Sequence, residues 1–311
     1  MDECMLDSTS VIKLPPYHSG KVRDIYKIPE NENLLLFVAT DRISAYDVIM
    51  GEGVPDKGYT LTQLSLLWFD MMSDIVPNHL VTADVSKYPE SCQPYAKYLV
   101  GRSMLVKKLN VLPIECIFRS RLTGSYWNAY KRATVQRTES RYVSFKEVCG
   151  FKFPTNLQEN YEIMPPLFTP STKANLGAHD ENVSIADASE MVGMEILAKV
   201  QDVGSRVFAR AIEYAAKRGI IIADTKFELA YDKKTRKIYL VDEVLTPDSS
   251  RFWPADKVRL GVTPPSFDKQ FLRDYLSQLD WDKTYPPPPL PKDIIVGTKE
   301  RYSEILLKLL L

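Results

Sequence analysis

Residues 220–232 read IIIADTKFELAYD and decide the fold, because they predict a strand that changes character halfway along its length. Three isoleucines followed by alanine are typical of a strand that is buried on both faces. From Asp224 onward, charged and apolar residues alternate. In an extended chain, residues two apart share a face, so Asp224, Lys226 and Glu228 point the same way. The question is whether this charged face meets solvent or forms a site.

The alternation alone favours a solvent-facing side of an antiparallel strand. The next strand, KIYLVDEV at residues 237–244, is joined to the first by KKTR, so the two predict a hairpin. Pairing in that hairpin can bring Asp242 beside the face of Asp224 and Glu228, where clustered carboxylates repel one another. Mg²⁺ removes that repulsion, since it binds a few carboxylate oxygens together with substrate phosphates. We therefore expect a magnesium site on this hairpin.

The composition excludes several classes of protein. The chain has 311 residues, of which 45% are hydrophobic and 26% charged, as in globular proteins of two lobes. Forty basic residues balance forty acidic ones, which argues against a strongly basic nucleic-acid binder. The N-terminus MDECMLDSTS does not resemble a secretory signal, and no apolar run reaches the roughly 20 residues of a membrane helix. The four cysteines are scattered without a Cys-x-x-Cys pair, which favours a reducing, cytoplasmic setting and disfavours a zinc site.

Periodicity places most other elements. Residues 34–39, LLLFVA, predict a buried strand, and apolar spacing over residues 61–75 predicts a helix. Two further strands lie on either side of Pro113, which marks our expected boundary between an N-terminal β-rich lobe, 1–112, and a larger C-terminal lobe, 113–311. Antiparallel strands followed by helices indicate an α+β fold.

The second lobe has three further features. Residues 131–162 are polar and irregular and predict a peripheral insert. Residues 186–219 predict one continuous helix that ends at Gly219. The stretch YPPPPLP at 285–291 predicts a stiff connector before a final amphipathic helix over 299–311.

Two segments near the N-terminus carry candidate site residues. HSGKVRDIY at 18–26 predicts a strand in which Gly20 allows close approach to a phosphate and Lys21 and Arg23 share a face. An exposed basic strand explains it equally well. The segment TDRISAYD at 40–47 follows a buried strand, where either a site or an ordinary turn is expected.

Two later segments suit a phosphomonoester. RSRLTGSYW combines Arg119 with a turn at Gly124 and Ser125, and TPDSSRFWP adds Arg251 beyond the hairpin. A planar guanidinium can bind two phosphate oxygens while the turn supplies amides, although a plain surface turn also fits.

The loop FTPSTKANLGAHDENVS at 168–184 concentrates polar residues, among them Lys173, His179 and Asp180. His179 has no second His or Cys at metal-binding spacing, so a zinc site is disfavoured. The loop either binds a small polar substrate or caps the helix that follows. His18 and His79 are interpreted as structural.

Together these segments resemble the phosphoribosylaminoimidazole-succinocarboxamide synthase (SAICAR synthetase) family, in its longer, fungal-type form. The motifs SGKVRDIY, TDRISAYD, PIECIFRSRLTGS, FTPSTKANLGAHDENVS, DTKFELA and DEVLTPDSSRFWP occur in the family's order from Ser19 to Pro254. The resemblance implies a two-lobed fold with ATP in the cleft, distantly similar to kinases and ATP-grasp proteins. It also implies a carbon–nitrogen ligase of purine biosynthesis that uses Mg²⁺ and ATP to join carboxyaminoimidazole ribotide (CAIR) to L-aspartate.

The resemblance also implies roles for individual residues. ATP is expected at Gly20, Lys21, Arg23, Lys107, Leu109, Val111, Glu115, Glu228 and Asp242, of which Glu228 and Asp242 would hold Mg²⁺. The ribotide phosphate is expected at Arg119, Gly124, Ser125 and Arg251. Asp224 and Lys226 would be catalytic, beside the imidazole or the reacting carboxylate, and aspartate is expected at Lys173, His179 and Asp180.

Two other functions fit part of the sequence. A kinase-like phosphotransferase explains the metal strand but leaves Arg119, Ser125 and Arg251 without a shared purpose. A non-catalytic nucleotide-binding protein is disfavoured because both metal carboxylates are present. The expected partners are CAIR, L-aspartate and ATP, with no nucleic acid and no membrane. The family contains monomers and homodimers, and no long apolar seam favours either.

Overall fold

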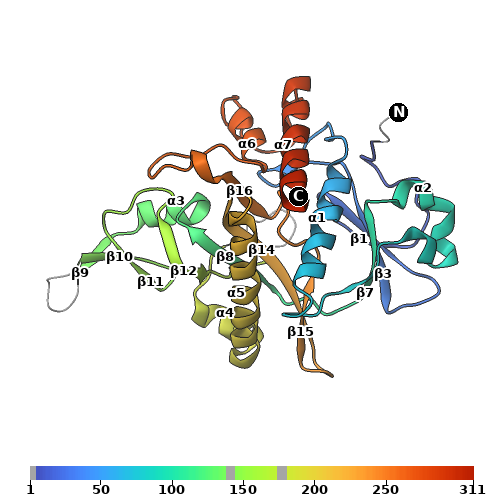
Figure 1. Ribbon diagram of the computed structural model, residues 1–311, viewed down its shortest axis with the longest axis horizontal. Helices are drawn as coiled ribbons and strands as arrows, with labels where there is room; N and C mark the ends of the chain where they lie inside the picture. The colour runs from blue at the N-terminus through green and yellow to red at the C-terminus, as the bar shows by residue number, and fades with distance from the viewer. Residues whose placement is uncertain (1–4, 138–143, 174–180) are drawn as a thin grey trace. The chain divides into compact units, whose positions relative to one another are not determined.

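The computed structural model describes residues 5–137, 144–173 and 181–311, which form two compact units (Figure 1). Unit one contains Met1–Val111, Ala230–Ser249 and Ser266–Leu311, and unit two contains Leu112–Leu229 and Ser250–Pro265. Among the helices in the described ranges, none combines the length and the apolar character that crossing a membrane requires.

Unit one is built on a five-stranded antiparallel sheet in the order β1-β2-β3-β7-β6. Its strands are β1 (Pro16–Ser19), β2 (Arg23–Lys27), β3 (Leu34–Ala39), β7 (Ser103–Lys107) and β6 (Leu80–Thr82). The predicted strand over 34–39 is confirmed as β3, and it is central because both of its faces are apolar and buried. Leu36 and Val38 pack with residues of η1 (Val85–Lys87), η2 (Glu90–Tyr95) and α2 (Ala96–Leu99).

Unit one also contains three longer helices and the short strands β4 (Ser44–Ala45) and β5 (Val48–Ile49). The helices are α1 (Lys57–Met71), α6 (Gln270–Ser277) and α7 (Lys292–Leu310), and α7 packs against both of the others (Figure 1). Asp248 joins all three, because its carboxylate lies 2.8 Å from Lys57 Nζ and 3.0 Å from Lys269 Nζ, and accepts a 2.7 Å hydrogen bond from the Tyr302 hydroxyl. Burial alone would raise the pKa of Asp248, but the two ammonium groups lower it.

The composition of unit one corrects the expected division of the chain. A single boundary near residue 112 assigns the C-terminal helix to the second lobe, whereas α7 belongs with the N-terminal sheet. The reason is that the apolar side of α7 packs on α1 and α6, and periodicity shows that a helix has an apolar side without showing which partner covers it.

Unit two is built on strands β12 (Glu162–Phe168), β8 (Ile114–Arg121) and β14 (Ile220–Asp232), with β13 (Ser171–Thr172) on β8 and β16 (Ser250–Pro254) on β14. β14 continues into unit one at Ala230 and pairs there with β15 (Lys237–Val241), which confirms the predicted hairpin. η3 (Ala255–Lys257) follows β16.

Two helices, α4 (Ile185–Val192) and α5 (Met194–Ala216), cover unit two, and α5 packs on β8 and β12 (Figure 1). Phe118 lies at the centre of this core, with ring centroids 5.0 Å from Phe168 and 5.7 Å from Phe227. Gly204 allows the close approach, since a Cβ there would lie 2.2 Å from the Phe118 ring. The prediction of one continuous helix was wrong, because Gly193 (φ 90°) interrupts it.

The insert of unit two is more ordered than its polar composition predicts. α3 (Gly124–Arg132) is followed by a three-stranded sheet of β9 (Val135–Arg137), β10 (Ser144–Val148) and β11 (Phe151–Pro154). Tyr126, Tyr130 and Phe153 belong to a separate small hydrophobic core within this insert. The interpretation as irregular chain was wrong because a few well-spaced aromatic residues suffice to hold a small sheet.

Candidate functional site

Asp224 lies between two arginines in unit two. In β14 it faces Arg119 of β8 on one side and Arg251 of β16 on the other. Its carboxylate lies 3.0 Å from Arg119 Nη1 and forms a second, shorter ion pair with Arg251. Asp224 and Arg119 are 5% and 2% exposed, so this is a buried cluster. Two guanidinium groups on one carboxylate leave a net positive charge, which favours an anion.

Neighbouring groups fix Arg119 in place. Its Nε donates a 2.9 Å hydrogen bond to Thr169 Oγ1, and its guanidinium carbon lies 5.1 Å from the centre of the Tyr126 ring. Burial lowers the pKa of Arg119, while the charge of Asp224 opposes that change. An arginine keeps its charge under these conditions, so Arg119 remains a cation. The sequence pattern assigned no role to Thr169 or Tyr126, although FTPSTKANLGAHDENVS and RSRLTGSYW contain them.

Arg251 also contacts the start of α3. A Cβ on Gly124 would lie only 2.5 Å from Arg251 Nη2, and Gly124 has φ 59°, which glycine adopts without strain. Thr123, which precedes the helix, makes no side-chain capping hydrogen bond. The first amides of a helix lack intrahelical partners and carry partial positive charge. The structure therefore places Arg251 and the exposed Ser125 at a helix start that is suited to an anion.

Lys226 and Glu228, which follow Asp224 on the same face of β14, are ion-paired within unit two. Lys226 Nζ lies 3.3 Å from Glu115 Oε2, and Lys173 Nζ lies 2.7 Å from Glu228 Oε2. Lys226 and Glu228 are only partly exposed, while Thr225, Phe227 and Leu229 on the other face are buried. This strand face is therefore not plain solvent-facing surface, the alternative that the alternation alone favours.

In unit one, residues 20–22 form the turn between β1 and β2, closed by a 2.7 Å hydrogen bond from Gly20 N to Arg23 O. The expectation of one strand carrying both cations was wrong, because Lys21 lies in the turn and Arg23 begins β2. Arg23 Nη2 lies 2.6 Å from Asp242 Oδ2, and Lys21 forms an ion pair with Asp47.

Asp242 follows β15 with a positive φ of 64°. Its backbone hydrogen-bonds to His79, a buried histidine that packs edge-on against Phe37 and Phe69. Burial lowers the pKa of His79 to about 3, so the ring is neutral at pH 7. His79 thus helps to hold the backbone of Asp242 in place. No spacing in the sequence indicates this contact.

The segment after β7 presents apolar side chains in unit one. Leu109 is half-buried, and Val111 is exposed while its backbone bridges to Ala230. Lys107 is exposed at the end of β7, with its ammonium 5.9 Å from the Tyr239 ring. Exposed apolar side chains beside a lysine suit an aromatic ring that carries polar atoms.

The predicted magnesium ligands belong to different units, Glu228 to unit two and Asp242 to unit one. Their shared ion therefore stays a prediction. Both supply carboxylate oxygens, the ligand type that Mg²⁺ prefers, and each is charge-balanced by a cation, Lys173 or Arg23. Within the described ranges, no three His, Cys, Asp or Glu side chains gather as a protein-only metal site. His179 and Asp180 lie outside the described residues.

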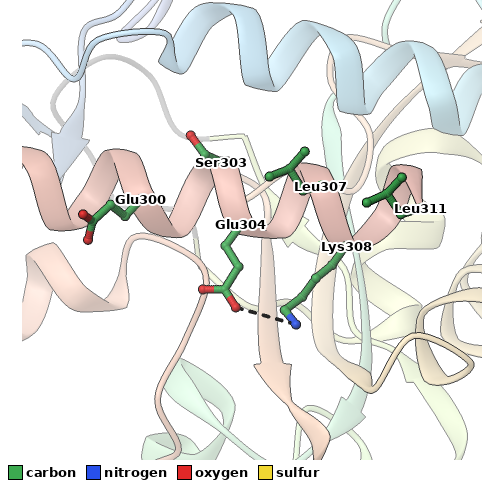
Figure 2. A pocket seen from close by; sticks show the side chains of 6 residues that line it. All are labelled: Glu300, Ser303, Glu304, Leu307, Lys308 and Leu311. Atoms are coloured by element: carbon green, nitrogen blue, oxygen red, sulfur yellow. Dashed lines mark ion pairs between the residues drawn. The ribbon is translucent and has the colours of Figure 1, made fainter.

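A shallow open hollow runs along the outer side of α7 (Figure 2). It is lined by Glu300, Ser303, Glu304, Leu307, Lys308 and Leu311. Its ion pair, Lys308 with Glu304 at 3.6 Å, is one turn apart on an exposed surface and contributes little. None of these six residues belongs to the predicted site.

The known proteins that this chain resembles, described here and in the next paragraph, all belong to one family. The model of the SAICAR synthetase family matches residues 16–288. The phosphoribosylaminoimidazole-succinocarboxamide synthase of Desulfotalea psychrophila is 55% identical and covers 98% of this chain and 97% of its own length. The synthase of Geobacter metallireducens is 52% identical over 93% of this chain and 92% of its own length.

A SAICAR synthase from Saccharomyces cerevisiae, solved in complex with SAICAR, has a TM-score of 0.83 and 42% identity, covering 97% of this chain and 96% of that one. A SAICAR synthetase from Pyrococcus horikoshii, 22% identical with a TM-score of 0.63 and coverage of 93% and 97%, shares the fold. The yeast structure and the two bacterial relatives all match this chain along nearly their whole length.

Proposed function

The chain belongs to the SAICAR synthetase family, and on that premise we propose how its residues divide the work of the ligase reaction. As a member of that family, the chain joins CAIR and L-aspartate to give SAICAR in purine biosynthesis. The finer assignments below, of ATP, Mg²⁺ and individual side chains, are our proposal. Its proposed setting is the cytoplasm, in line with free thiols at Cys92, Cys116 and Cys149.

ATP drives the reaction because a carboxylate is a poor electrophile towards an amine. An oxygen of the CAIR carboxylate attacks the γ-phosphorus of ATP, and ADP leaves, which gives an acyl phosphate. The aspartate nitrogen, after losing a proton, attacks the acyl carbon to form the C–N bond. The C–O bond to phosphate then breaks, and inorganic phosphate leaves. Positioning and electrostatic stabilisation supply most of the catalysis in such phosphoryl transfers.

The observation that carries the proposal is the packing of Arg251 on Gly124 at the start of α3. A guanidinium and free helix amides at one place suit a phosphate dianion, and the ribotide is a phosphomonoester. Arg119 adds the second positive charge beside Asp224, and Ser125 adds a hydroxyl. The related yeast structure contains SAICAR, which carries the same ribotide phosphate.

Asp224 and Lys226 are proposed to lie beside the reacting carboxylate. They share one face of β14, and Arg119 and Arg251 tie Asp224 to the phosphate pocket on that strand. An ammonium on this face offsets the negative charge that builds up as the phosphoryl group is transferred. Glu115, 3.3 Å from Lys226 Nζ, holds the ammonium in place.

Unit one is proposed to hold ATP. Gly20, Lys21 and Arg23 would meet its phosphates at the turn before β2, where Gly20 keeps the backbone accessible. The adenine ring would lie along Leu109 and Val111, with Lys107 at its polar edge; the family pattern adds Glu115, which belongs to unit two, to the ATP residues. This list follows the family pattern, and the half-buried Leu109 and exposed Val111 after β7 support it.

Glu228 and Asp242 would hold Mg²⁺, which when bound neutralises phosphate charge. The ammonium of Lys173 lies 2.7 Å from the Glu228 carboxylate. Its proposed role in binding aspartate therefore requires the ammonium to exchange one carboxylate for another. His179 and Asp180 complete the proposed aspartate site. The oligomeric state, monomer or homodimer, stays a prediction.

The test is the release of ADP over many turnovers, with CAIR and aspartate each omitted in turn. The proposal predicts sustained release only when both are present. Sustained release without aspartate would contradict the ligase and favour a phosphotransferase.

A further inference from the structure

Arg42 makes an unusually complete set of hydrogen bonds within unit one. It lies just after β3, and its side chain is 17% exposed. Two of its nitrogens donate to the two Asp24 carboxylate oxygens, each at 2.9 Å. Its Nη2 also donates to Gly20 O and its Nε to Lys21 O, both at 3.1 Å, and Nη1 donates to Asp7 O at 3.3 Å. One guanidinium thus serves five acceptors.

Two of those acceptors belong to the turn at residues 20–22. The backbone carbonyls of such a turn need hydrogen-bond donors. Here the side chain of Arg42 donates to the carbonyls of both Gly20 and Lys21. The turn is short and lies at the surface. Without these hydrogen bonds its backbone would sample several conformations. Arg42 therefore selects one backbone conformation for the segment that carries Lys21.

Asp24 holds Arg42 from the other side of the turn. It is 6% exposed and accepts further hydrogen bonds from Ser19 Oγ at 2.5 Å and Thr9 Oγ1 at 2.6 Å. Ser19 precedes the turn and Asp24 follows it, so the carboxylate joins its two ends. A bidentate arginine–carboxylate pair has fixed geometry, which a lysine in place of the arginine does not reproduce.

We infer that Arg42 is a positioning residue for the phosphates of ATP, acting through the backbone of residues 20–22 without touching the nucleotide. This inference rests on the proposed binding of ATP phosphates by Lys21 and Arg23. Holding the turn in its binding conformation beforehand removes an ordering cost from nucleotide binding. Loss of Arg42 therefore weakens ATP binding selectively.

The alternative is that Arg42 merely stabilises the fold, and Arg102 offers a matched control. Arg102 also pairs with a buried carboxylate of unit one, since its Nη1 lies 2.9 Å from Asp41 Oδ2. Its partner Asp41 is held by the amides of Leu6 and Gly58, outside the turn at residues 20–22, so replacing Arg102 by lysine perturbs a comparable ion pair at a different place.

The experiment measures steady-state kinetics of Arg42→Lys and Arg102→Lys with each substrate varied separately, alongside Tm. We expect Arg42→Lys to raise KM for ATP at least about tenfold, equivalent to roughly 1.4 kcal/mol, while kcat and the KM values for CAIR and aspartate change less than about twofold. Arg102→Lys should leave KM for ATP unchanged. An unchanged KM for ATP in Arg42→Lys, or an equal rise in Arg102→Lys, overturns the inference.

Two more variants separate this inference from the proposed function. Lys21→Met alone should raise KM for ATP, and Lys21→Met combined with Arg42→Lys should raise it by less than the product of the single effects, because both act through one turn. A rise in Lys21→Met without one in Arg42→Lys defeats only the inference. No rise in Lys21→Met defeats the assignment of ATP to this turn. If Arg42→Lys fails to fold, Asp24→Asn replaces it, with the same ATP-selective rise expected.

Discussion

Arg251 and Asp224 face each other across β16 and β14, and their ion pair holds the arginine against Gly124 at the start of α3. This relationship joins three segments that are far apart in the sequence. It places a positive charge where helix amides lack partners, which is the basis of the ribotide assignment.

Arg251→Ala should raise KM for CAIR by about 30-fold or more, since losing one partner of a hydrogen-bonded charge pair costs roughly 2 kcal/mol at least. KM for ATP should stay unchanged. Arg259→Ala is the control, because the side chain of that exposed arginine of the same segment donates to the nearby carbonyls of Asp256 and Val258. A defect confined to ATP would refute the phosphate pocket.

Gly124→Ala should also raise KM for CAIR. The new Cβ would lie 2.5 Å from Arg251 Nη2, so the guanidinium must move. Gly150→Ala provides the control, because Gly150 has a similarly positive φ of 84° with nothing within 4 Å of a Cβ. Both variants should lose roughly 1 kcal/mol of stability through backbone strain, measured by Tm. Equal KM values for CAIR in the two variants would show that contact with Arg251 is irrelevant.

Asp242→Asn should lower kcat by roughly 100-fold, as expected for a lost metal ligand, and raise the Mg²⁺ concentration needed for half-maximal activity. Tm should shift by less than about 4 °C, because Arg23 keeps Glu243 at 3.2 Å as a second partner. Glu243→Gln, which removes that second partner, should keep the Mg²⁺ requirement. Near-normal turnover in Asp242→Asn would reject the metal assignment.

Acid should destabilise the chain partly through Asp24. Burial tends to raise the pKa of Asp24, but hydrogen bonds from Arg42, Ser19 and Thr9 outweigh it and lower the pKa below 3.8. Since the folded pKa is the lower one, the unfolded chain takes up the proton first. The stabilisation is therefore present above about pH 4 and lost as pH falls through the folded pKa. The free energy of unfolding in urea should fall less steeply below pH 5 in Asp24→Asn than in the wild type; equal slopes would contradict this.

Local patterns predicted the hairpin of residues 220–241 correctly, because alternation and turn residues are encoded within a few positions of the strand. The residues that neighbour Asp224 were harder to predict from the sequence. The structure places Arg119 and Arg251 on either side of it, and no local pattern pairs these three residues. The register of β8 is set by packing around Phe118 in a core whose members lie up to 109 residues from it in sequence, which no local pattern records.

The segment TDRISAYD shows the same limit. Its position after a buried strand indicated either a site or a turn, and the spacing left both open. In the structure, Asp41 accepts hydrogen bonds from Gly58 N and Leu6 N, and Arg42 holds the turn at residues 20–22. These partners are 17 to 35 residues away, so their roles follow from the fold and not from the motif.

The most direct test of the account follows one oxygen atom. CAIR whose carboxylate carries ¹⁸O at both positions is converted with ATP and aspartate, and the inorganic phosphate is analysed by mass spectrometry. Attack of the carboxylate on ATP predicts one ¹⁸O in each phosphate released and one in the new amide of SAICAR. Phosphate free of ¹⁸O would contradict activation of the CAIR carboxylate by phosphoryl transfer.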